Sequence, residues 1–104
     1  MGLFGIFKKR KPLQSLSTDA QDLFAEIARD ANGELVKIRM PGQVIWDTNG
    51  KQFVDEIEPS KEGRWKAAVD ELVGADLLGP IGRNPHRLYV VTKNGASISA
   101  GMAR

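Results

Sequence analysis

The amino-acid sequence predicts an α+β domain, and three kinds of apolar pattern lead to that prediction. Apolar side chains recur every three to four residues over 20–31 and over 65–73, which is the spacing of one face of a helix. Over 34–40 the period changes to two, the period of a strand. Two short apolar runs, 77–81 and 88–92, enclose a polar loop and so predict a hairpin. The expected order is helix, small β-hairpin, helix and two-stranded ribbon.

Length and composition narrow the class of protein. A chain of 104 residues suffices for one domain with a modest core. The chain has no cysteine, which excludes disulfides and thiolate metal sites, and His86 cannot build a zinc site alone. No apolar run reaches the roughly 18 residues of a membrane-spanning helix, and the N-terminus lacks the pattern of a secretory signal. We therefore expect a cytoplasmic protein without a metal or other cofactor.

Charge is segregated along the chain, although the net charge is only +2. Residues 8–11 and the tail from residue 77 onward are basic, whereas 13–34 and 55–76 are acidic. A nucleic-acid-binding surface would have to use local basic patches, because the chain has no strong overall positive field.

Residues 1–14 form an appendage to a domain that spans 15–104. Four large apolar side chains are followed at once by four basic ones, a pattern typical of a segment that lies on an anionic membrane surface. Docking on the domain's own core or on a partner, or disorder, would account for the same pattern. The residues that we expect to contact a membrane or a partner are Leu3, Phe4, Ile6, Phe7, Lys8, Lys9, Arg10 and Lys11.

The first helix is predicted over 18–31. Thr18 and Gln21 have the spacing of a capping box, and Asn32-Gly33 is a stop signal. We expect its charged face to be solvated. Its apolar face comprises Ala20, Leu23, Phe24, Ile27, Ala28 and Ala31.

The next segment, 34–40, is predicted to be a strand with one buried face. Val36, Ile38 and Met40 alternate with Leu35 and two basic residues. We therefore expect those three side chains to form the apolar face of the strand.

Two turn signals leave the pairing of the following strands open. Pro41-Gly42 would pair the segment 44–48 with the strand before it, whereas Asn49-Gly50 would pair it with 51–54. The acidic stretch 55–59 then forms a connector that we expect to be solvated.

The second helix follows Pro59, with Ser60 as its expected N-cap and Gly74 as the glycine that ends it. We expect Trp65 to be buried against the first helix. The apolar face comprises Trp65, Ala68, Val69, Leu72 and Val73.

The last part of the chain resembles a known family. Gly74-Ala75-Asp76-Leu77-Leu78 forms a G-x-x-L-L turn, 82–87 is a polar loop, and Val91-Thr92-Lys93-Asn94-Gly95 should open a last helix. In this order the motifs resemble the second half of small prokaryotic or phage winged-helix (winged helix-turn-helix) domains, best over 60–95. The resemblance implies a recognition-type helix followed by a C-terminal two-stranded wing. The sequence departs from the family over 34–54, which is β-like where a winged helix has its second helix.

This resemblance implies a non-enzymatic DNA-binding protein, a small transcriptional regulator that contacts double-stranded DNA through the helix and the wing. Asp70 and Glu71 share the outer surface of that helix and would repel phosphates. The residues that we expect to bind nucleic acid are Lys61, Arg64, Lys66, Arg83, Asn84, His86 and Arg87.

A second interpretation is a winged-helix protein–protein interaction module, attached peripherally to a membrane through the N-terminal appendage. The acidic helix surface favours this interpretation, whereas the basic wing favours DNA binding. An enzyme is not expected, because the sequence has neither a phosphate-binding loop nor a nucleophile beside a base. The sequence leaves the oligomeric state open.

Overall fold

The computed structural model describes residues 15–57, 62–82 and 87–102 of the chain. In these ranges the fold is α+β, as the sequence predicts. The elements, in chain order, are α1 (Thr18–Arg29), β1 (Glu34–Met40), β2 (Gln43–Thr48), β3 (Lys51–Glu56), α2 (Arg64–Gly74), β4 (Leu78–Ile81), β5 (Leu88–Val91) and α3 (Lys93–Met102).

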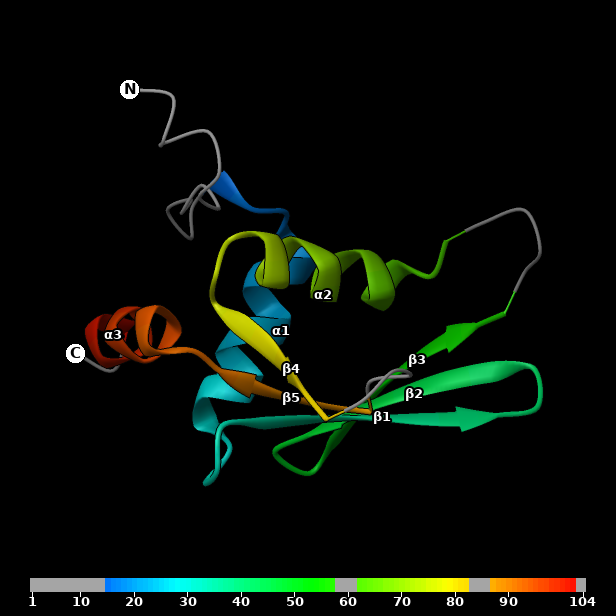
Figure 1. Ribbon diagram of the computed structural model, residues 1–104. Coiled ribbons are helices and arrows are strands. Elements are labelled where there is room, and N and C mark those ends of the chain that lie inside the picture. The colour runs from blue at the N-terminus through cyan, green and yellow to red at the C-terminus, as the bar shows by residue number, and fades with distance from the viewer. Residues whose placement is uncertain (1–14, 58–61, 83–86, 103–104) are drawn as a thin grey trace.

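The strands form one antiparallel sheet in the order β3-β2-β1-β5-β4. α1 and α2 lie on the same face of this sheet, and α3 lies near its end, beside β5 (Figure 1). We call the face toward α1 and α2 the inner face and the opposite one the outer face. No element in the described part of the chain covers the outer face (Figure 1).

Both turn signals in the β-region are used. Gly42 lies in the turn between β1 and β2, and Asn49-Gly50 joins β2 to β3. Asn49 and Gly50 have φ angles of 51° and 76°, the left-handed conformation that a two-residue hairpin turn requires. The two pairings that the sequence left open therefore coexist, and 34–56 is a three-stranded meander.

The side chains of β1 face in the opposite direction to the prediction. Leu35 is fully buried, whereas Val36, Ile38 and Met40 are 39%, 36% and 46% exposed. The strand register explains why the opposite face is buried. Lys37 of β1 lies opposite Trp46 of β2, so the two side chains share a face, and the indole of Trp46 is buried on the inner face. Leu35 is therefore the fully buried residue of β1, and the three alternating apolar residues lie on the outer face.

The ends of α1 differ slightly from the prediction. Its N-cap is Ser17 rather than Thr18, because the Ser17 hydroxyl accepts the N–H of Ala20 at 3.2 Å. The helix ends at Arg29, two residues before the expected end. Asp30 follows, and its carboxylate accepts backbone N–H groups from Asn32, Glu34 and Asn49. Asp30 thereby ties the end of α1 to β1 and to the β2–β3 turn.

The start of α2 depends on Asp55, which the sequence suggested to be solvated. The helix begins at Arg64 with Gly63 as its N-cap, and Ser60 lies outside the described residues. Asp55 is only 6% exposed, and its two oxygens accept the backbone N–H groups of Trp65 and Lys66 at 2.9 Å each. A Cβ on Gly63 would lie 2.4 Å from one of these oxygens, so this position requires glycine.

The end of α2 also uses a different residue from the predicted one. Gly74 is the last helical residue, and the left-handed conformation occurs at Asp76, with a φ of 61°. The Leu77 N–H then donates to the carbonyl of Leu72 at 2.9 Å. Thr92 starts α3, as predicted, since its hydroxyl accepts the Gly95 N–H at 3.0 Å and donates to the carbonyl of Asp76.

The buried tryptophan of the core is Trp46, not Trp65. Trp46 is 1% exposed, and its indole N–H donates to Asp55 at 3.2 Å. Trp65 is half-buried, and its ring meets that of Phe53 edge-on with the centroids 4.6 Å apart.

The rest of the predicted apolar face of α2 is correct. In α1 two expectations fail, because Ala31 lies beyond the end of the helix and is exposed, and Glu26, which was expected to be solvated, is buried at 7% exposure. The fully buried large side chains are Trp46, Phe24, Leu23, Ile27, Leu35, Leu72, Leu77, Leu78 and Val69.

We expect Asp55→Ala to lower the free energy of unfolding by about 2–4 kcal/mol, because it removes a helix cap and leaves the indole N–H of Trp46 unpaired in the core. Urea denaturation followed by tryptophan fluorescence measures the change. Glu56→Ala, at the adjacent exposed position, is the control and should change the stability by less than about 0.5 kcal/mol. Equal effects of the two substitutions would contradict the role of Asp55.

We also expect Asp30 to contribute to acid denaturation. The pKa of Asp30 lies below its ordinary value of 3.8, chiefly because the Glu34 N–H donates to its carboxylate. Since the folded protein holds the proton less tightly than the unfolded chain, the stabilisation is complete above the ordinary pKa of 3.8 and is lost as pH falls below 3.8 and through the lower pKa of the folded protein. Asp30→Asn should therefore lower Tm at neutral pH and reduce the further loss of Tm between about pH 5 and pH 3. Asp22→Asn, at an exposed position of α1, is the control for the removal of one carboxylate.

Candidate interaction surfaces

The basic residues predicted to contact DNA from α2 are paired with acidic residues. Arg64 donates from Nε and Nη2 to the two carboxylate oxygens of Asp19, each at 2.7 Å, and this bond lowers the pKa of Asp19. Its guanidinium also stacks on Trp65, 4.7 Å from the ring centroid. These contacts hold Arg64 between α1 and α2 and neutralise most of its charge.

Lys66 is also neutralised, on its own helix. Its ammonium lies 2.8 Å from Asp70 and 3.5 Å from Glu62, and the hydrogen bond to Asp70 is the main reason that its pKa is raised. Lys61 lies outside the described residues. The described surface of α2 therefore offers no unpaired cation to a phosphate.

Most of the predicted wing and all of the N-terminal appendage lie outside the described ranges. Arg87 is exposed, forms no ion pair with any other described residue, and accepts the Lys37 N–H at its backbone carbonyl at 2.8 Å. Arg87 is thus the one residue of the predicted wing contact that lies in the described ranges. The residues whose predicted contacts fall outside it are Arg83, Asn84 and His86 of the wing and Leu3, Phe4, Ile6, Phe7, Lys8, Lys9, Arg10 and Lys11 of the appendage.

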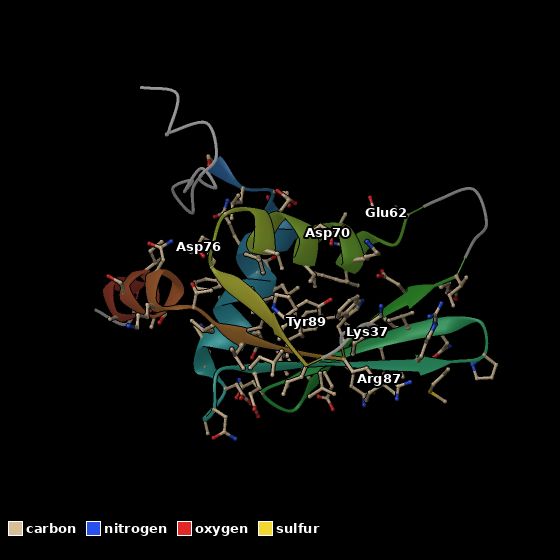
Figure 2. The ribbon with its side chains drawn as sticks, in the orientation of Figure 1. Lys37, Glu62, Asp70, Asp76, Arg87 and Tyr89 are labelled. Carbon is tan, nitrogen blue, oxygen red and sulfur yellow. The ribbon has the colours of Figure 1, made fainter. Side chains whose placement is uncertain are left out.

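A groove of about 220 Å³ lies on the inner face, between the start of α2 and β1 to β3. Figure 2 shows Lys37 and Tyr89 pointing from the sheet toward α2, which carries Asp70. The Lys37 ammonium lies 5.4 Å from the centroid of Trp46, and its pKa is lowered by burial and then by the positive charges of Arg39 and Lys66. Burial also raises the pKa of Tyr89.

This inner groove is balanced in charge. It is lined by the cations Lys37, Arg39 and Lys66 and by the acids Asp55 and Glu62, with Glu56 of β3 at its margin, where strand alternation turns the side chain to the outer face. The Asp55 carboxylate already accepts a backbone N–H of α2, and the Lys66 ammonium already pairs with the carboxylates of Glu62 and Asp70. The groove therefore lacks the excess of positive charge that a nucleic-acid backbone requires.

The outer face of the sheet is an apolar surface that the described residues leave uncovered. Val36, Ile38 and Met40 of β1 are joined there by Val54 of β3 and Ile81 of β4, which are 44% and 46% exposed. The register makes the surface continuous, because Ile38 pairs with Ile45 and Ile45 with Val54, while Val36 pairs with Leu88 and Leu88 with Ile81. We call these residues the outer apolar face: Val36, Ile38, Met40, Ile45, Val54, Ile81 and Leu88.

The charged residues that the strands contribute to the outer face all have one sign. By strand alternation, the charged side chains on that side of the sheet are Glu34, Asp47 and Glu56. None of the strand residues there is Lys or Arg, since Lys37, Arg39 and Lys51 occupy inward positions. The surface is thus apolar with a carboxylate margin. The sequence pattern contained this signal, but the alternating residues of β1 were expected to face the core.

Metal and membrane sites receive no support from the described part of the chain. Within residues 15–57, 62–82 and 87–102, no group of three or more His, Cys, Asp or Glu side chains is placed to hold a metal ion. In the same ranges no helix has the length and apolar character needed to cross a bilayer.

Comparisons with known proteins do not place the chain in a family. No protein-family model matches it, and no curated protein or solved structure is significantly similar to it. The surfaces described above therefore carry the information on function.

Proposed function

We propose that this domain is a non-enzymatic protein interaction module that binds its partner through the outer apolar face. The observation that carries the proposal is the continuous exposure of Val36, Ile38, Met40, Val54 and Ile81 across the sheet. Contiguous apolar surface of this kind marks interaction sites on soluble proteins. Fully burying one such side chain contributes about 1.5–3 kcal/mol, so covering five partly exposed ones contributes on the order of 4–6 kcal/mol before the cost of association.

The charges on this face define the chemistry of the partner. Glu34, Asp47 and Glu56 lie on the same side as the apolar residues, and no cation from the strands joins them. A matching segment therefore presents apolar side chains flanked by Lys or Arg, because charge complementarity speeds encounter and excludes acidic competitors. A second outer apolar face would bring carboxylates against carboxylates, which disfavours direct packing of two sheets.

DNA binding through a winged-helix arrangement is the second proposal. It is supported by the chain order, in which α2 precedes the β4–β5 hairpin, and by the place of β5 between β1 and β4. The ion pairs of Arg64 with Asp19 and of Lys66 with Asp70 weigh against it, because phosphates would have to displace carboxylates. We therefore place protein interaction first.

Selection of short random peptides on the full-length protein tests the first proposal. We expect the selected peptides to carry apolar residues beside Lys or Arg and to shift the NMR signals of β1 to β3. Ile38→Gln should weaken their binding about 5–10-fold, the equivalent of roughly 1–1.4 kcal/mol. Ile57→Gln is the matched control, since Ile57 is also exposed, at 50% against 36% for Ile38, but lines the inner groove. Loss of binding with Ile57→Gln and not with Ile38→Gln would remove the outer apolar face as the site.

Titration of mixed-sequence duplex DNA at several salt concentrations tests the second proposal. If the wing contacts phosphates, replacing Arg83 and Arg87 by Ala should lower the slope of log affinity against log salt by about 2, roughly one for each lost contact. Lys93→Ala, in α3, is a control of the same charge outside the wing. A slope that is the same in the parent and in the double variant would contradict DNA binding by the wing.

A further inference from the structure

We propose that the partner segment is supplied by a second copy of this chain, so that residues 3–11 of one copy bind the outer apolar face of the other. This inference rests on the proposed function, because it uses the same surface. It joins two features of one chain, an apolar surface that no described residue covers and an N-terminal apolar segment followed by four basic residues.

The two features are complementary in polarity and in charge. Residues 3–7 contribute four large apolar side chains, and residues 8–11 are all Lys or Arg. The outer apolar face contributes Val, Ile, Met and Leu side chains, and the charged residues beside it are the carboxylates Glu34, Asp47 and Glu56. Apolar burial would supply the attraction, and the opposite charges would fix the direction of the segment across the strands.

The length of the chain favours a second copy over the same copy. α1 rises from the sheet on the inner side, and its first turn is fastened to α2 where the Ser17 N–H donates to Glu71 at 2.9 Å (Figure 1). A helix of 12 residues is about 18 Å long, and a segment that precedes it must also pass the edge of the sheet to reach the outer face. Lys8 precedes Ser15 by seven residues, which span at most about 25 Å when fully extended. The basic run of one copy would therefore have to be almost fully extended to meet the carboxylates on its own outer face, and no such demand applies to another copy.

Reciprocal binding would give a dimer in which each copy donates one segment and receives one. Such an arrangement closes under twofold symmetry without direct contact between the two acidic sheet faces. Because part of the attraction is between exposed opposite charges, the dimer should weaken as salt rises.

The absence of cysteine provides a direct test on the full-length chain. Gly5→Cys introduces a single thiol for a nitroxide label in the apolar segment. This labelled chain is mixed with an unlabelled chain that carries isotopes only in its Ile, Val and Met methyl groups. We expect the nitroxide to broaden the methyl signals of Ile38, Met40 and Val54 in the isotope-labelled copy and to spare the buried Ile27. Ser97→Cys, on α3, is the control position for the label and should leave the three outer signals sharp.

Two further variants should weaken the contact between the two copies. Changing Lys8, Lys9, Arg10 and Lys11 together to Glu should reduce dimer affinity at least tenfold in sedimentation equilibrium, because it places like charges against the carboxylate margin. Ile38→Gln should abolish the broadening while leaving the chain folded.

The other outcomes overturn the inference in distinguishable ways. Broadening that appears only when label and isotopes are on the same chain would assign the segment to its own copy. Sedimentation with anionic vesicles, with the outer methyl signals unbroadened, would assign it to lipid. If selected peptides still depend on Ile38 while the nitroxide leaves the outer methyl groups unaffected, the proposed function stands and the second copy is not the partner. If neither experiment involves Ile38, both proposals fail.

Discussion

The carboxylate of Asp55 is the contact on which the two layers of the domain depend. From the inner side of β3 it accepts the indole N–H of Trp46 and the first N–H groups of α2, so one buried side chain joins the sheet, the core and a helix terminus. Since side chains alternate along a strand, an inward Asp55 turns Val54 outward. The strand pairing carries that orientation to Ile45 and Ile38. The residue that anchors the helix therefore also determines which apolar residues stay exposed.

The helices and strands could be predicted from the sequence. The face of β1 that is buried and the residue that caps α2 could not. Local periodicity over 20–31 and 65–73 predicts the two helices, which the structure places at Thr18–Arg29 and Arg64–Gly74, because residues three and four apart share one face of a helix. Alternation over 34–40 reports that a strand has two unlike faces, but the side that becomes buried depends on Trp46 from the neighbouring strand. The N–H groups of α2 are capped by a strand residue rather than by Ser60, and no local signal records a contact of that kind.

The candidate site was predictable to the same limited extent. Asp70 lies four residues after Lys66, so their ion pair could be read from helical spacing. Arg64 and Asp19 are 45 positions apart, and only the packing of α1 against α2 brings them together. The outer apolar face was present in the sequence as alternating apolar residues. Alternation shows that the strand has one apolar face, but it does not show which face the helices cover.

The turn at Asn49 and Gly50 has a consequence for the chemical ageing of the protein. Asparagine followed by glycine is the dipeptide most prone to lose ammonia and become aspartate, and asparagine is a thermolabile residue. The Asn49 amide donates to Glu26 at 2.8 Å, and this bond is the first cause of the lowered pKa of Glu26. An aspartate at 49 would set a second negative charge against the Glu26 side chain, which is 9% exposed, with Lys51 as the nearby cation from β3. Deamidation at this exposed turn would therefore loosen the contact between α1 and the β2–β3 hairpin, because the new carboxylate would repel the Glu26 side chain to which the amide now donates.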